Sequence, residues 1–100
     1  MATYAISFDL KWNDSYNARY ASFMEQVNKC KTVWKETTSF ALVESDETID
    51  AIERRLWLSK FDSTTDILLV IDVSYDTATI RGATKDRSTL KKLMYGIKEK

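Results

Sequence analysis

Residues 3–10 read Thr-Tyr-Ala-Ile-Ser-Phe-Asp-Leu, and this stretch decides the fold that the sequence predicts. Apolar residues from Tyr4 to Leu10 alternate with small or polar ones, which is the period-2 pattern of a half-buried strand. Asp9 is the unexpected residue, because aspartate is depleted in strands. We interpret Asp9 either as a ligand at the end of a central strand or as a turn residue that accepts backbone hydrogen bonds.

The remaining residues predict elements in the order βαββαβ, followed by one more strand and one more helix. A stripe of Tyr16, Tyr20, Phe23, Val27 and Cys30 marks the first helix and is interpreted as core. Trp34 and Trp57 are interpreted as core residues as well. Strands are expected at 3–10, 32–37, 39–44, 66–75 and 77–83, and helices at 15–30, 46–59 and 87–98.

This order predicts an α+β, ferredoxin-like fold with an antiparallel sheet in strand order 4-1-3-2 and both helices on one face. One domain is expected over residues 1–100, with a core at 3–75 and a strand-helix extension at 77–98. The neighbours of strand 1 both run antiparallel to it. Asp9 should therefore lie near Ser39, which opens strand 3, and near Asp66, which opens strand 4.

The fourth strand is apolar on both sides, since its core reads Ile-Leu-Leu-Val-Ile at 67–71. One side faces the helices, and the other needs a cover. An open apolar sheet face usually meets another subunit, so a symmetric homodimer is expected. The alternative is that the extension at 77–98 covers this face itself.

The composition excludes several classes of site. The sequence has no histidine, a single cysteine and two glycines, which excludes a histidine base, a zinc cluster and a glycine-rich phosphate loop. Cys30 is interpreted as a small buried residue. Any catalysis must therefore use carboxylates, hydroxyls, lysines, arginines or a hard metal ion on oxygen ligands.

The charge is neutral overall but unevenly distributed. Residues 1–80 carry 8 basic and 13 acidic side chains, and residues 81–100 carry 7 basic and 2 acidic ones. The basic set can contact a nucleic-acid backbone, or it can be the solvated face of a helix. It consists of Arg81, Lys85, Arg87, Lys91 and Lys92.

No apolar run is long enough to span a membrane, and no signal peptide is recognised at the start of the sequence. The cytoplasm is therefore the expected location, with no membrane partner.

Two stretches carry a resemblance to a known family. Tyr-Ala-Ile-Ser-Phe-Asp-Leu at 4–10 and Thr-Thr-Ser-Phe-Ala-Leu-Val at 37–43 resemble the small CRISPR-associated adaptation nucleases, protein two of that system. The wider superfamily includes virulence-associated D toxins and stand-alone relatives of unknown role. The resemblance covers residues 3–83 as an order of elements. It is specific at Asp9 and at Ser39-Phe40.

The resemblance implies that Asp9 from each subunit of a homodimer holds a divalent metal, Mg²⁺ or Mn²⁺, at the dimer axis. Asp9 would then be catalytic as well as metal-binding, and Ser39 would orient an attacking water or a phosphate. For Ser39 a turn hydroxyl is the alternative. Trp12, in the link beside Asp9, is a further candidate because an aromatic ring can stack on a base.

Two hypotheses for function follow. The first is a homodimeric, metal-dependent nuclease-like protein that acts on RNA or DNA, such as an endoribonuclease, or an inactive relative. The second is a non-enzymatic protein-interaction module, such as an antitoxin or regulator, that binds a partner through the open sheet face.

Overall fold

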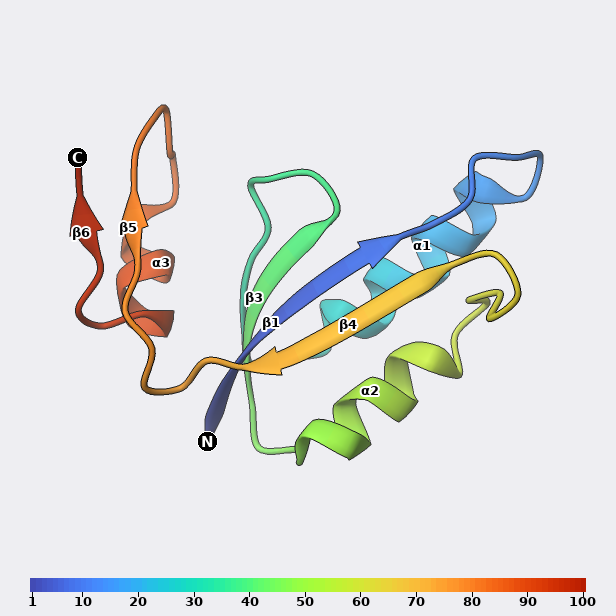
Figure 1. Ribbon diagram of the computed structural model, residues 1–100, viewed down its shortest axis with the longest axis horizontal. Helices are drawn as coiled ribbons and strands as arrows, with labels where there is room; N and C mark the ends of the chain where they lie inside the picture. Colours follow the sequence, from blue (N-terminus) through green and yellow to red (C-terminus); the bar gives the residue numbers. More distant parts are fainter.

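The computed structural model describes residues 1–100 and has an antiparallel four-stranded sheet at its centre (Figure 1). Its strands are β1 (Ala2–Asp9), β2 (Thr32–Trp34), β3 (Phe40–Ser45) and β4 (Ile67–Asp72). They are ordered β2-β3-β1-β4, which is the predicted order read from the other edge. The ferredoxin-like arrangement is therefore confirmed, with β1 central and β2 and β4 at the edges.

Two helices, α1 (Tyr16–Val27) and α2 (Ile49–Trp57), cover the first face of this sheet. The main core lies between them and the strands. Its fully buried members come from all of these layers: Ile6, Phe23, Val27, Ala41, Val43, Ile52 and Leu56. The alternation in residues 3–10 correctly predicted which side chains of β1 point inward, because Tyr4, Ile6 and Phe8 all belong to this core.

The predictions for the first two helices were wrong in part, both in their bounds and in one aromatic residue of each. The first helix ends at Val27 rather than at residue 30, and Tyr20 in its aromatic stripe is 39% exposed. The second helix begins only at Ile49, because Thr48 is its N-cap and accepts a hydrogen bond from the Ala51 amide. Trp57, predicted as core, is 44% exposed at the end of α2.

Three strands are shorter than predicted, whereas β1 and β3 keep their predicted lengths with bounds shifted by one residue. β2 ends at Trp34, and β4 ends at Asp72, where the Asp72 side chain accepts hydrogen bonds from the Ser74 amide and hydroxyl. Such local side-chain bonds replace the ladder and turn the chain. The fifth strand, β5, is reduced from residues 77–83 to Thr79–Ile80.

The extension predicted as a strand and a helix contains one more element. Helix α3 (Arg87–Leu93) stops at Leu93, because Met94 leaves the helical conformation at φ −126° and ψ 79°. The predicted helix to residue 98 is therefore wrong at its end. Residues Lys98–Glu99 form β6, which pairs in parallel with β5.

This C-terminal unit packs against the second face of the sheet, over β2 and β3, on the side away from α1 and α2 (Figure 1). A second cluster of buried side chains joins the two layers: Ala5, Trp34, Leu42, Leu90, Leu93 and Met94. Thr3 fastens the unit to β1 through a hydrogen bond from its hydroxyl to the Leu93 carbonyl at 3.2 Å. The extension thus covers part of the sheet face that the sequence left open. None of the helices is long and apolar enough to cross a membrane.

Candidate functional site

Asp9 is the last residue of β1, and its side chain is exposed. It pairs with Ile67 at the start of β4. The preceding residue, Phe8, donates its backbone N–H to the Ser39 carbonyl at 3.1 Å. Antiparallel pairing therefore brings Asp9 and Ser39 to the same end of the sheet, as expected from the order of the strands.

Ser39 occupies a turn before β3 and adopts a positive φ of 56°. Few residues other than glycine adopt this left-handed conformation, and short polar residues do so most readily. Its side chain is exposed. The backbone of Ser39 thus serves the turn, which agrees with the alternative interpretation of this residue.

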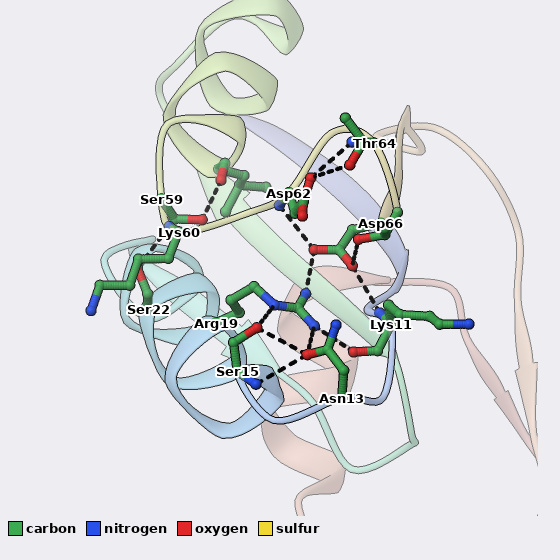
Figure 2. A network of polar contacts seen from close by, with 12 residues as sticks. Lys11, Asn13, Ser15, Arg19, Ser22, Ser59, Lys60, Asp62, Thr64 and Asp66 are labelled. Atoms are coloured by element: carbon green, nitrogen blue, oxygen red, sulfur yellow. Dashed lines mark hydrogen bonds and ion pairs between the residues drawn. The ribbon is translucent and has the colours of Figure 1, made fainter.

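Asp66 also lies at this end of the sheet, but its carboxylate is committed to a buried network rather than to Asp9 (Figure 2). One oxygen accepts from Arg19 at 2.5 Å and from the Asp62 amide at 2.9 Å, and the other accepts from the Lys11 amide at 2.8 Å. The side chains of Arg19 and Asp66 are 7% and 0% exposed. Asp66 therefore has no free oxygen to offer a metal ion.

Arg19 completes this network from α1. Its guanidinium donates to the Ser15 hydroxyl at 2.9 Å, to the Asn13 side chain at 3.1 Å and to the Lys11 carbonyl. The network thus joins the link after β1, the first turns of α1 and the loop before β4 (Figure 2). These are the segments that surround Asp9.

The pKa of Asp66 reflects opposing effects. Burial acts to raise it, but hydrogen bonds from the backbone amides of Lys11 and Asp62 and from Arg19 outweigh burial, and the pKa lies below its ordinary value. The carboxylate is thus kept charged opposite Arg19. This arrangement is typical of a structural ion pair rather than of an acid or base that exchanges protons.

The chain brings no three carboxylate or thiol side chains together into a group that could hold a metal ion. Asp9 alone supplies one carboxylate. A site for Mg²⁺ or Mn²⁺ at Asp9 would need further oxygen ligands from water, from a nucleic acid or from a second copy of the chain.

The basic residues predicted for nucleic-acid binding all belong to the C-terminal unit, but two are engaged in ion pairs. Arg87 and Lys91 contact the Glu99 carboxylate at 2.9 and 3.4 Å. The amide of Lys85 donates to Glu36 at 2.9 Å, which ties the loop before α3 to the β2–β3 connection. Part of the basic set therefore stabilises the extension itself.

Trp12 is 77% exposed in the link after Asp9. Its ring lies 4.5 Å from that of Tyr16, which in turn stacks on Tyr20 at 5.8 Å. The sequence interpreted Tyr16 and Tyr20 as core: Tyr16 is partly buried against the main core, but Tyr20 is exposed and ends this aromatic ladder. An exposed aromatic ladder of this kind can stack on bases or pack against a protein.

Cys30 is buried, as the sequence indicated, and lies 3.4 Å from an Arg55 nitrogen. Burial raises the pKa of the thiol, and the Arg55 contact only partly offsets this effect. Arg55 also holds Glu47 through two hydrogen bonds, at 2.8 and 2.9 Å. This second ion-pair cluster joins α2 to the end of β3 and has a structural role.

Three exposed apolar side chains lie on one face of β4. Ile67, Leu69 and Ile71 point away from α1 and α2 and are 64%, 53% and 46% exposed. We call these three residues the β4 stripe. The C-terminal unit reaches β2 and β3 but leaves the stripe uncovered, together with Ser7 and Asp9 on the neighbouring strand.

The outer edge of β4 also has free backbone groups. The Val73 amide donates to the Thr3 carbonyl at 2.8 Å, so alternate residues at 73, 71, 69 and 67 face β1. The backbone groups of Leu68 and Val70 therefore point outward. The strand lacks proline and lysine, two residues that commonly block pairing at an edge.

Comparison with known proteins adds no relative. No protein-family model, no curated protein and no solved structure matches this chain. The resemblance to the CRISPR-associated nucleases therefore stays a prediction from the two sequence stretches.

Sequence reasoning missed the Arg19–Asp66 network, although a signal for it was present. Arg19 lies three residues after Tyr16 and four before Phe23, so it falls on the inward side of the first helix. A charged residue on such a side requires a buried partner. Asp66, an acid placed directly before an apolar strand, was the available candidate.

Proposed function

We propose that this chain is a protein-interaction module that binds through β4, and that its first partner is a second copy of itself. The observation that supports this best is the coincidence of two features on one strand. The β4 stripe presents apolar side chains, and the outer edge of the same strand presents unpaired backbone groups. A strand added at such an edge gains both hydrogen bonds and apolar burial.

Self-association is favoured because the strand is self-complementary. If two copies of β4 pair antiparallel about Val70, the uncharged residues 69–71 of the two copies lie opposite one another. Asp72 of each copy then lies opposite Leu68 of the other, so like charges are kept apart. The two four-stranded sheets would become one continuous sheet with two-fold symmetry.

Sedimentation equilibrium over micromolar to millimolar concentrations tests this proposal. The expected result is a weight-average mass that rises from one chain to two as concentration increases. A mass of one chain over the whole range would contradict self-association. The strand edge would then require another protein as its partner.

The nuclease hypothesis remains a second candidate, and the position of Asp9 supports it. Asp9 is exposed on the same sheet face as the β4 stripe, and the exposed Trp12 follows it three residues later in the chain. If two stripes pack face to face rather than edge to edge, the two Asp9 carboxylates can come to the interface. Both carboxylates would then coordinate one Mg²⁺ or Mn²⁺ ion. Such an ion would supply an activated water for phosphodiester hydrolysis.

Asp9→Asn tests the nuclease hypothesis, because it removes the charge and keeps the shape of the side chain. If Asp9 holds the metal, cleavage of labelled RNA or DNA with Mg²⁺ or Mn²⁺ should fall by about a hundredfold or more, since removing key electrostatic groups has effects of this size. Asp14→Asn, an exposed acid in the following link, is the matched control and should cleave like the wild type. Equal cleavage by the wild type and Asp9→Asn, or no cleavage by either, would contradict this candidate.

A further inference from the structure

Edge-to-edge pairing through β4 leaves the centre of one sheet face open, and the inference drawn here rests on that proposed pairing. In an antiparallel pair about Val70 the two-fold axis is perpendicular to the sheet, so the second faces of both copies lie on the same side. Strand pairing uses the backbone edge of β4 and leaves the side chains of that face in solvent. The two β4 stripes therefore join into one apolar patch, in which Leu69 of each copy lies opposite Ile71 of the other.

The register of β1 adds polar groups to this patch. Asp9 pairs with Ile67 and Ser7 pairs with Leu69, so all four side chains share the second face. Ser7 and Asp9 are exposed. Asp9 is the only charged residue on this face of β1 and β4, and it forms no ion pair within the chain. The joined patch is therefore apolar along its centre and carries one negative charge towards each end.

The two C-terminal units stand as walls beside the patch. In each copy this unit packs over β2 and β3, on the side away from α1 and α2 (Figure 1). In the paired sheet β2 and β3 are the outer strands of each copy, so the units flank the open strands β1 and β4. The result is a trough. With strands about 4.8 Å apart, the two β3 strands are about 24 Å apart, which leaves room between the walls for one α-helix about 10–12 Å across.

From this geometry we infer that the trough binds one amphipathic α-helix of a partner protein, with basic side chains towards both ends of its apolar stripe. The apolar stripe of that helix covers the two β4 stripes, and its basic side chains pair with the two Asp9 carboxylates. Strand spacing and rise place these carboxylates about 25 Å apart, on a line that crosses the sheet diagonally. A helix spans this distance with about 16 residues. An apolar helix face laid in a groove is a common mode of recognition.

A second pair of copies fits the trough less well than a basic helix does. Two sheets that pack face to face lie about 10 Å apart, and the C-terminal units on both faces stand in the way of such an approach. Face-to-face packing would also bring four Asp9 carboxylates of like charge towards one another. A basic helix supplies the opposite charge instead.

Two labelled synthetic peptides test this inference. Both have about 18 residues, enough for the span, and a leucine stripe at helical spacing. One peptide has lysines at its first two and last two positions, and the other has glutamates there. Fluorescence anisotropy, at chain concentrations above the Kd of self-association, should give one lysine peptide bound per two chains. The lysine peptide should bind about tenfold or more tightly than the glutamate peptide, because two attractive pairs become two repulsive ones.

Three variants separate the trough from the β4 edge. Asp9→Asn should bind the lysine peptide about three- to tenfold more weakly, the effect expected of two exposed ion pairs. Ser7→Lys places a positive charge on the floor beside Leu69 and should weaken binding of the same peptide by about tenfold or more. Asp14→Asn, an exposed acid outside β1 and β4, should bind it like the wild type. All three variants should keep the wild-type Kd of self-association, because none changes β4.

Sedimentation equilibrium distinguishes the failure of this inference from the failure of the proposed self-association. A chain that forms pairs but binds neither peptide, or binds both equally, contradicts the trough alone. The same holds if Asp9→Asn binds the lysine peptide as the wild type does, or if one peptide binds each single chain. A mass of four chains without peptide would show that a second pair covers the face. A mass of one chain at all concentrations would contradict both proposals.

Discussion

Asp66→Asn is expected to lower the free energy of unfolding by about 3–5 kcal/mol at pH 7, the usual cost of removing one partner of a buried ion pair. The Asp66 side chain is fully buried, so the variant leaves the Arg19 guanidinium without a counter-charge. Its amide nitrogen would also face donors: Arg19 and the Asp62 amide in one orientation of the side chain, or the Lys11 amide in the other. Urea unfolding followed by circular dichroism measures this loss.

The pH dependence gives this prediction a second, independent readout. The pKa of Asp66 in the folded chain lies below the value of about 3.9 that an unfolded aspartate has. Its stabilisation is therefore fully present above about pH 4 and is lost as the pH falls through the folded pKa. The difference in free energy of unfolding between the wild type and Asp66→Asn should be constant from pH 7 to about pH 4. Below pH 4 this difference should shrink.

Asp14→Asn is the control for this experiment, because Asp14 is exposed. A change of less than about 0.5 kcal/mol is expected for such a surface position. An Asp66→Asn variant as stable as the control at pH 7 would show that the buried pair does not hold the link after β1 in place.

Leu69→Lys is expected to weaken self-association by about tenfold or more. Pairing about Val70 places Leu69 opposite Ile71 of the second copy, and this contact covers part of a side chain that is 53% exposed in the single chain. A cross-strand pair of this kind contributes roughly 0.2–1 kcal/mol, and the two-fold axis repeats it, so the two pairs together contribute about 1.4 kcal/mol, which corresponds to about tenfold in Kd. Repulsion between two lysines on neighbouring strands adds to the effect.

Leu58→Lys is the matched control for Leu69→Lys. Leu58 is 62% exposed at the end of α2, outside the β4 stripe. Sedimentation equilibrium should give the control the same Kd as the wild type. If both variants weaken association equally, or if neither does, the β4 stripe is not the interface.

The sequence was sufficient to predict the fold because its strongest patterns are local. Alternation in residues 3–10 and the apolar run at 67–71 place two strands, and the order of elements then determines the sheet. The ends of the elements were less predictable. Thr48 begins α2 and Asp72 ends β4 through the hydrogen bonds of one side chain each, and hydrophobic periodicity does not detect such bonds.

The C-terminal unit was only partly predictable for a different reason. β5 and β6 have two residues each and are held by one another and by the second sheet face. Strands this short have no periodicity of their own, since tertiary packing determines them. The prediction for Trp57 failed for a related reason. The sequence shows a large apolar residue beside the buried face of α2, but it does not determine whether this side chain points into the core or into solvent.

Of the candidate site, the sequence predicted the proximity of Asp9 and Ser39, because antiparallel pairing alone implies it. It did not predict that Asp66 turns toward Arg19, since that requires knowing the direction of a side chain at the end of a strand. The buried indole N–H of Trp34 has no acceptor in the chain, and this could not be predicted at all. Whether a buried indole has an acceptor depends on neighbours distant in sequence.

Hydrogen exchange at the Val70 amide tests edge-to-edge pairing through β4 most directly, because this N–H points away from β1 and has no partner within the chain. Pairing about Val70 predicts that this amide exchanges freely in dilute solution and becomes protected as concentration rises, in parallel with dimer formation. Free exchange of the Val70 amide at concentrations where the chain is fully dimeric would contradict the account, and would show that the two copies meet elsewhere.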